Sequence, residues 1–129
     1  MEEDQGKHLA YGRVIWARLV DRHGYSKERP GIIMTPSDRI HGDSPLLVMA
    51  ITTSFTDPPP RWHVPLPWNP DPRRVGTRLA QRSAAVVDWL DTIDAAEVLD
   101  VKGQVPDKVM KRIEMELQRR AAQEADELT

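Results

Sequence analysis

Residues 26–38 read SKERPGIIMTPSD and change abruptly from charged to apolar. Arg29 and Pro30 stand directly before the run GIIM, which has the composition of a buried strand. Proline is tolerated at the first position of a strand, because the hydrogen bond that its nitrogen cannot donate is not needed there. The sequence therefore predicts a strand over residues 30–35, with an arginine at its mouth and a polar loop before it.

Four other segments have the character of strands. Val, Ile, Leu and Trp are concentrated in residues 11–20 and 46–55. The segment 84–94 begins in the same way, and we expect it to bend near Asp88. Residues 62–68, WHVPLPW, contain two prolines and are therefore expected at the edge of a sheet.

The last part of the chain predicts a helix. Pro106 suits a first helical position, and Asp107 suits the positive end of the helix dipole. Apolar residues then recur on one helical face, at Val109, Met110, Ile113, Leu117 and Ala121. We therefore expect an amphipathic helix from 106 to about 124. Short strands followed by one helix are typical of a mainly β fold, with a small, strongly curved antiparallel sheet or barrel and a helix packed on it.

Length and composition narrow the class of protein. A chain of 129 residues has the usual size of one domain, which we assign to residues 11–124, with flexible segments at 1–10 and 125–129. The chain has no cysteine, which excludes disulfides and fits a reducing cytoplasm. Its start is acidic and polar, and no apolar run approaches the roughly 20 residues of a membrane span. We expect a cytoplasmic protein without a membrane segment.

No motif for a metal or a cofactor is present. The histidines are dispersed and lack ligand spacing, at His8, His23, His41 and His63. A glycine-rich phosphate loop, a Walker lysine and a nucleophile elbow are all missing from the sequence. We therefore predict neither a metal nor a cofactor.

An arginine and a group of hydroxyls remain as candidates for chemistry, together with two carboxylates: Arg29, Thr52, Thr53, Ser54, Asp88 and Asp91. Antiparallel neighbours bring the start of one strand beside the end of the next, so Arg29 and Thr52 are expected to converge. A guanidinium beside a hydroxyl is suited to holding phosphate. The alternative from the residues alone is a solvated Arg29 and ordinary strand threonines.

The chain resembles the PemK/MazF family of type II toxin–antitoxin endoribonucleases in the order of its motifs, which are GRVIWARL, RPGIIMTPSD, LLVMAITTS, WHVPL and AAVVDWLDTID ahead of VPDKVMKRIEMEL. The resemblance covers roughly residues 11–118. It implies an SH3-like antiparallel barrel of about five to seven strands with a C-terminal helix, a homodimer, and an antitoxin protein as partner. It also implies metal-independent cleavage of single-stranded RNA by attack of the ribose 2′-hydroxyl on its phosphate. The family's catalytic arginine falls on Arg29, and its catalytic threonine or serine falls on Thr52.

Further positions are candidates for RNA contacts. Gly31 would permit close approach of the backbone. His63 is a residue type suited to proton transfer, although a strand histidine that packs against its neighbours is an equal alternative. The loop NPDPRRVGTRLAQR, with Arg82 at its end, would attract phosphate in a chain whose net charge is −2. The RNA-binding set is Gly31, Thr53, Ser54, His63, Arg73, Arg74, Arg78 and Trp89.

Residues 89–94, WLDTID, depart from the family pattern Gln-Ile-Arg-Thr-Ile-Asp. Asp91 stands where the family has arginine and would repel phosphate. Trp89 stands where the family has an amide, and it either stacks on an unpaired base or belongs to the core. These departures motivate a second hypothesis, a non-catalytic barrel that binds protein or RNA. A related branch that poisons gyrase through an aromatic near the chain end is disfavoured, because the end AAQEADELT has none.

Overall fold

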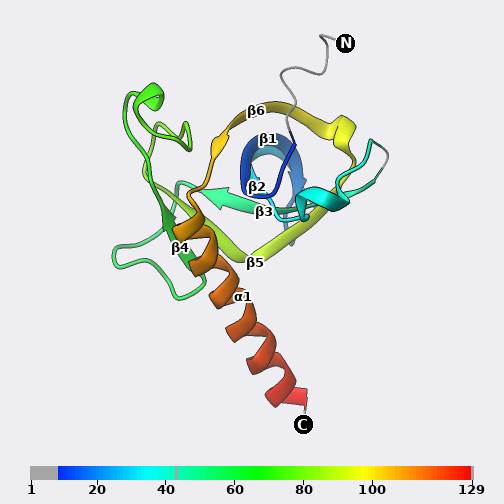
Figure 1. The fold of residues 1–129 in the computed structure, drawn as a ribbon. Coiled ribbons are helices and arrows are strands. Elements are labelled where there is room, and N and C mark those ends of the chain that lie inside the picture. The colour runs from blue at the N-terminus through cyan, green and yellow to red at the C-terminus, as the bar shows by residue number, and fades with distance from the viewer. Residues whose placement is uncertain (1–8, 43, 129) are drawn as a thin grey trace.

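The computed structural model describes residues 9–42 and 44–128. Within them, six strands precede one long helix: β1 (Arg13–Val20), β2 (Ser26–Ile33), β3 (Leu46–Thr52), β4 (His63–Leu66), β5 (Ser83–Ile93), β6 (Val98–Gln104) and α1 (Asp107–Leu128). The strands form one sheet in the order β4-β5-β3-β2-β1-β6, and all neighbours are antiparallel. The sheet is strongly curved (Figure 1). The prediction of a mainly β, curved antiparallel sheet with a C-terminal helix is confirmed.

The sheet is not a closed barrel, in contrast to the prediction. Its edge strands β4 and β6 do not pair with each other among the described residues. β4 is four residues long and contains Pro65, which cannot donate a ladder hydrogen bond. β6 instead ends on loops: Gln104 N–H donates to the Gly76 carbonyl at 2.9 Å, and Val105 N–H donates to the Gly12 carbonyl at 2.9 Å.

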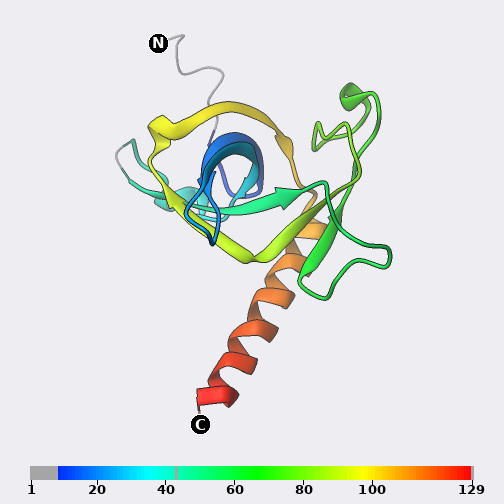
Figure 2. The same ribbon diagram turned by 180° about the vertical axis from the view of Figure 1, so that it is seen from behind.

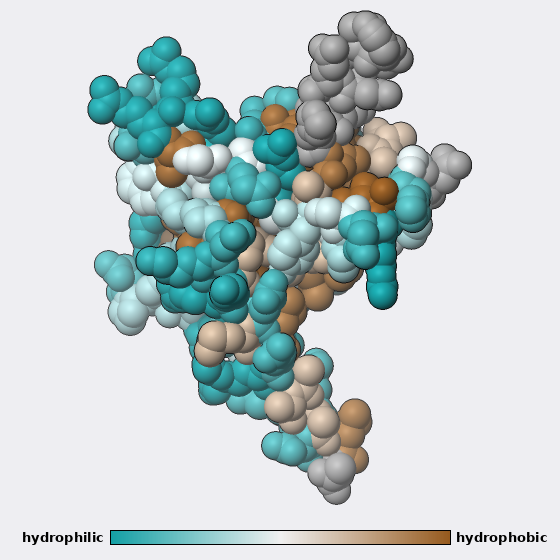
Figure 3. All heavy atoms as spheres, in the orientation of Figure 1, coloured by the Kyte–Doolittle hydropathy of each residue, from teal (hydrophilic) through white to brown (hydrophobic). Residues whose placement is uncertain are grey.

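Two apolar clusters hold the sheet and the helix together. One lies on strands β1, β2, β3, β5 and β6 and consists of Ile15, Ala17, Leu19, Ile33, Leu46, Val48, Ala50, Ile93 and Val98. The other joins the opposite side of the sheet to α1, whose Met110 and Ile113 are buried in it. Figure 3 shows that hydrophobic residues are also visible at the surface beside α1.

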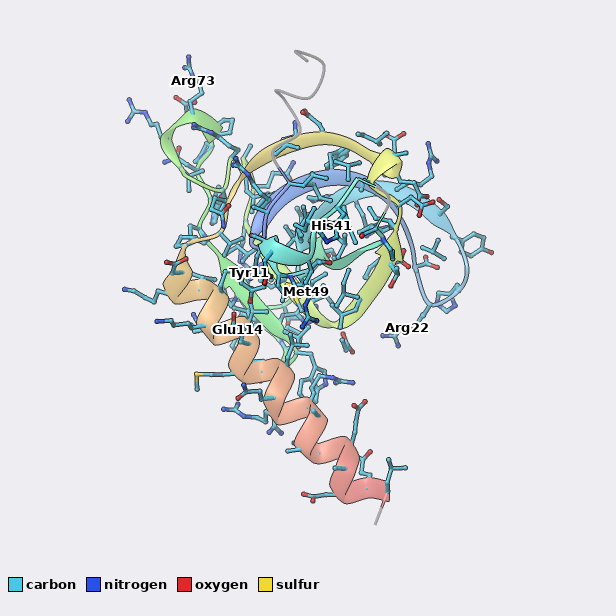
Figure 4. All side chains as sticks on the ribbon, turned by 45° about the vertical axis from the view of Figure 1, so that its right-hand side comes forward. Tyr11, Arg22, His41, Met49, Arg73 and Glu114 are labelled. Carbon is cyan, nitrogen blue, oxygen red and sulfur yellow. The ribbon has the colours of Figure 1, made fainter. Side chains whose placement is uncertain are left out.

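The first half of the helix packs against the sheet, where Met110 and Ile113 are buried. Tyr11 donates a hydrogen bond from its hydroxyl to Glu114 of α1 (Figure 4), and burial together with this carboxylate raises the pKa of Tyr11. The second half of α1 projects away from the sheet in both ribbon views (Figures 1 and 2).

Two expected boundaries and one missed strand need correction. β2 begins at Ser26, so the segment before Pro30 is strand and not loop. β6 was not expected, because its sequence VLDVKGQ buries only Val98 and Gly103 and lacks a regular apolar pattern. α1 continues to Leu128, past the expected end near 124, because AAQEADEL contains no glycine or proline to stop it. Of the expected flexible segments, residues 1–8 and residue 129 lie outside the described residues, whereas residues 125–128 belong to α1.

Gly103 is the position at which β6 meets the loop before β5. A Cβ on this residue would lie 2.2 Å from the Gly76 carbonyl oxygen and 2.5 Å from the Thr77 carbonyl carbon. We expect Gly103→Ala to lower the free energy of unfolding by about 1–3 kcal/mol, because backbone on both sides must move apart. Urea denaturation measures the change.

Gly42→Ala is the matched control, because no atom lies within 4 Å of a Cβ at Gly42. Equal stability of the two variants would contradict the close contact between β6 and the loop.

Candidate active site

A cleft of about 610 Å³ opens where β2, the end of β3 and the middle of β5 meet the β1–β2 loop. It collects side chains that are far apart in the sequence, and those able to take part in chemistry or stacking are Asp21, Arg22, His23, Arg29, Thr52, His63, Asp88 and Trp89. Five of the residues singled out from sequence therefore share one cavity: Arg29, Thr52, His63, Asp88 and Trp89.

The register of β2 and β3 brings Arg29 and Thr52 together. Gly31 pairs with Ala50, and the ladder continues in register through Ile32 and Ile33. In the other direction the paired positions end at Gly31, and Arg29 and Thr52 each lie two residues beyond this last pair, on the side that the alternation of side chains gives to one face. Arg29 itself pairs with Ala17 of β1 and is half-buried. It is thus held by a strand, whereas the sequence suggested a flexible loop.

Trp89 covers the guanidinium of Arg29. The Arg29 Cζ lies 4.6 Å from the centroid of the indole ring, a cation–π contact. The indole Nε1–H donates to the Val20 carbonyl at 3.1 Å, and the ring packs against the apolar cluster of the sheet. Trp89 therefore belongs partly to the core and partly to the cleft, and it restrains Arg29 from one side.

Asp91 is tied to the end of β1. Its Oδ2 accepts a hydrogen bond from the Val20 N–H at 3.0 Å, and the residue is not among those that line the cleft. Both departures from the family pattern, Trp89 and Asp91, thus bind the backbone of Val20. The repulsion of phosphate expected from Asp91 is reduced by this placement.

A bulge in β5 directs its residues into the cleft. Met49 of β3 pairs with Leu90, whereas Ile51 pairs with Ala85, so on the β3 side only Ala50 stands opposite residues 86–89. Extra residues in one strand bend it and redirect its side chains. The bend expected near Asp88 coincides with this bulge, which places Asp88 and Trp89 on the cleft wall.

Thr52 is held at the end of β3 by a short turn. Its Oγ1 accepts a hydrogen bond from the Ser54 N–H at 3.1 Å and lies 3.4 Å from the Ser54 carbonyl, to which it can donate. Ser54 is exposed beside it. Thr53 points to the other face of the strand and lines a separate cavity with Trp16 and Pro30.

The β1–β2 loop supplies residues that sequence reasoning missed, Arg22 and His23. The Asp21 carboxylate accepts hydrogen bonds from the N–H groups of Tyr25 and His23, both at 2.9 Å, and these bonds, that from Tyr25 first, lower the pKa of Asp21. The pattern DRHGY, with a carboxylate that can cap a turn and a glycine at φ 86°, signals such a tight loop. Arg22 then lies 3.9 Å from Asp88 across the cleft.

Gly31 lies beneath the site and not on its surface. It is buried, and a Cβ there would lie 2.5 Å from Val48 Cγ1 and 3.2 Å from the Met49 carbonyl oxygen. The close approach that this glycine permits is therefore that of β2 to β3. The role expected for it at the RNA surface is replaced by one in core packing.

The loop arginines lie away from the cleft, which corrects their expected position beside it. Arg73 and Arg74 pair with Asp71 at 3.1 and 3.6 Å, and Arg78 donates to the Pro72 and Arg73 carbonyls. Figure 4 shows Arg73 and Arg22 on opposite sides of the molecule. Asp71 and these carbonyls fold the loop onto itself.

Arg82 also has a structural partner. Its guanidinium donates to the carbonyls of Phe55 and Thr56, both at 3.1 Å, and lies 3.8 Å from the Phe55 ring centroid. It therefore fastens the loop between β3 and β4.

Among the described residues, no group of three or more His, Cys, Asp or Glu side chains comes together in a way that could hold a metal ion. Within the same residues, no helix has the length and apolarity needed to cross a membrane.

Comparison with known proteins gives a family. The family model of PemK-like, MazF-like toxins of type II toxin–antitoxin systems matches residues 10–120. No curated protein matches the chain.

Solved structures share the fold at low sequence identity. The MazF of Deinococcus radiodurans is 14% identical, with a TM-score of 0.67 over 88% of this chain and 96% of that one. An endoribonuclease from a mycobacterial species is 17% identical, with a TM-score of 0.66 over 91% and 94%. A mycobacterial endoribonuclease in complex with its cognate antitoxin is 19% identical, with a TM-score of 0.66 over 88% and 95%.

The contacts of Trp89 predict its contribution to stability. Trp89→Phe keeps an aromatic ring over Arg29 but loses the hydrogen bond to Val20, so we expect the free energy of unfolding to fall by about 1 kcal/mol. Trp89→Ala also loses the apolar packing and the cation–π contact, and we expect a loss of roughly 2–4 kcal/mol. Urea denaturation measures both.

Trp68→Phe is the control, because Trp68 is 43% exposed and a surface change should alter stability by less than about 0.5 kcal/mol. If Trp89→Phe were as stable as the unchanged protein, the indole bond to Val20 would not contribute.

Proposed function

The chain belongs to the PemK-like, MazF-like toxins of type II toxin–antitoxin systems, and we propose that it is a metal-independent endoribonuclease that cleaves single-stranded RNA. The observation that supports this most is the presence of Arg29 and Thr52 in one cleft. These are the positions on which the family resemblance sets the catalytic arginine and the catalytic hydroxyl.

In the proposed reaction the ribose 2′-oxygen attacks the adjacent phosphorus, and the bond to the 5′-oxygen breaks. The products are a cyclic phosphate and a free 5′-hydroxyl. Negative charge grows on the nonbridging oxygens in the transition state, where a fixed guanidinium and hydroxyl stabilise it more than they stabilise the ground state.

Arg29 is suited to electrostatic stabilisation and not to the role of base. A guanidinium keeps its proton in proteins and offers five donors in a rigid fork. The strand position of Arg29 and the Trp89 ring over it limit its movement, so less reorganisation accompanies the reaction.

We propose a protein antitoxin as the natural partner. One structural neighbour is an endoribonuclease in complex with its cognate antitoxin, and another is a MazE–MazF complex from Deinococcus radiodurans. An acidic segment that folds on binding could cover Arg22 and Arg29 and exclude RNA. The homodimer implied by the family resemblance stays a prediction.

A non-catalytic module that binds RNA or protein is the second candidate. Asp88 lines the cleft together with Arg22 and Arg29. Its carboxylate would repel a phosphate there. Cleavage and binding therefore have to be measured side by side.

The test is incubation of the purified protein with a long single-stranded RNA in EDTA, with mapping of the new 5′ ends. We expect discrete cuts. Arg29→Ala and Thr52→Ala should each slow cleavage by about 100-fold or more, because each removes a donor to the transition state. Arg29→Lys keeps the charge but loses the fork, and should also be impaired.

Arg73→Ala is the matched control, since it removes an arginine that does not line the cleft, and it should cleave like the unchanged protein. Circular dichroism checks that each variant is folded. Intact RNA with a folded protein would favour the binding module, and an active Arg29→Ala would refute the assignment of the site.

A further inference from the structure

Three buried side-chain atoms have no hydrogen-bond partner in the described part of the chain: Arg29 Nε, His63 Nδ1 and Glu116 Oε1. Buried polar atoms are almost always paired, so each unpaired one calls for an explanation such as a bound water. Arg29 lies under the Trp89 ring. The other two atoms belong to different elements, β4 and α1, and meet at one place.

That place is a second cavity, of about 200 Å³, between β4 and α1. It is lined by Arg61, His63, Val64, Arg112, Met115 and Glu116. His63 also lines the cleft with Arg29 and Thr52, so this residue borders both cavities. Of its two ring nitrogens, Nδ1 is the buried one without a partner.

The cavity suits water. A water molecule occupies about 30 Å³ in the liquid and needs two to four polar partners. His63 Nδ1 and Glu116 Oε1 have no direct bond to each other, and one water between them would satisfy both. The carboxylate is itself fixed, because Arg119 donates to its other oxygen, Oε2, at 2.8 Å.

We propose that Glu116 positions His63 through a bridging water, and that His63 is the base that removes the proton from the ribose 2′-hydroxyl. The catalytic part of this inference rests on the proposed ribonuclease function. Glu116 is a positioning residue, because it acts on the substrate through His63 alone.

The arrangement fixes where the proton lies on the ring. Nδ1–H donates to the water, and the water donates to Glu116 Oε1. Nε2 then keeps its lone pair for the cleft, since in a neutral imidazole one nitrogen donates and the other accepts. A free neutral histidine does not favour the Nδ1–H form. Here that form is set by the hydrogen bond that Nδ1 makes.

The proposed step balances without a further reactant. Nε2 takes the 2′-hydroxyl proton while the bond from O2′ to phosphorus forms. The bond from phosphorus to O5′ breaks, O5′ takes a proton from solvent, and the imidazolium returns its proton to solvent. Arg29 and Thr52 stabilise the phosphorane in between.

The first measurement is the tautomer of His63, from the ¹⁵N chemical shifts of histidine-labelled protein at alkaline pH, where imidazoles are neutral. The His63 signals are those that disappear in His63→Gln. We expect mainly the Nδ1–H form in the unchanged protein. Glu116→Leu, which has similar bulk but no acceptor, should shift it to mainly Nε2–H.

Glu124→Leu is the control. Glu124 also pairs with an arginine of α1, Arg120 at 3.9 Å, and it does not line the cavity, so the tautomer should not change. A His63 that is mainly Nε2–H in the unchanged protein, or that does not respond to Glu116→Leu, would overturn the pairing.

The second measurement is the kinetics of RNA cleavage. His63→Gln should lower kcat by about 100-fold, and Glu116→Leu by about tenfold, with KM changed less than about twofold. Adding Glu116→Leu to His63→Gln should cause no further loss, because Glu116 acts through His63. Additive losses would overturn the positioning role.

The two measurements distinguish failure of the proposed ribonuclease function from failure of the pairing between Glu116 and His63. If the unchanged protein leaves RNA intact, the catalytic step is refuted together with the proposed function. The tautomer still decides whether Glu116 and His63 are paired.

Discussion

The close approach of β2 to β3 at Gly31 is the constraint on which the rest of the structure depends. Without a side chain at this position, Val48 and the Met49 carbonyl can lie against the β2 backbone. The pairing of Gly31 with Ala50 sets which side chains share a face, and a slip of one residue would exchange the two faces. The same pairing that buries Ile33 and Val48 therefore also brings Arg29 and Thr52, each two residues beyond the last pair, to the same cleft. Packing and chemistry depend on one register.

Trp89 and Asp91 show how a change in one motif can be absorbed by its surroundings. Each has a partner on Val20, one at its carbonyl and one at its N–H. Together they fasten β5 to the end of β1, next to the loop that supplies Arg22 and His23. In a family that has an amide and an arginine at these positions, such a link would need other residues. At position 91, an aspartate that accepts a hydrogen bond from Val20 thus stands where the family pattern has a positive charge.

Sequence alone predicted what depends on local pattern. The apolar runs predicted most strands and the helix. Arg29 stands at the start of one strand and Thr52 at the end of its antiparallel neighbour, and from this order we predicted that the two lie close together. The sequence analysis missed β6, since VLDVKGQ is held by contacts with distant loops and not by its own pattern. It also misplaced Arg73, Arg74 and Arg78, because the position of a loop in the fold cannot be predicted from its positive charge. The meeting of His63 with Glu116 depends on how α1 crosses β4, which no local pattern contains.

Positive and negative side chains both line the cleft, so we expect its shape to matter more than its net charge for what binds there. Arg22 and Arg29 are opposed by Asp21 and Asp88, so the cleft is no general trap for phosphate. The carboxylates are engaged, however: Asp21 by the loop backbone and Asp88 by Arg22 at 3.9 Å. At this distance, and with the Arg22 side chain 77% exposed, the ion pair contributes little, about 0–1 kcal/mol.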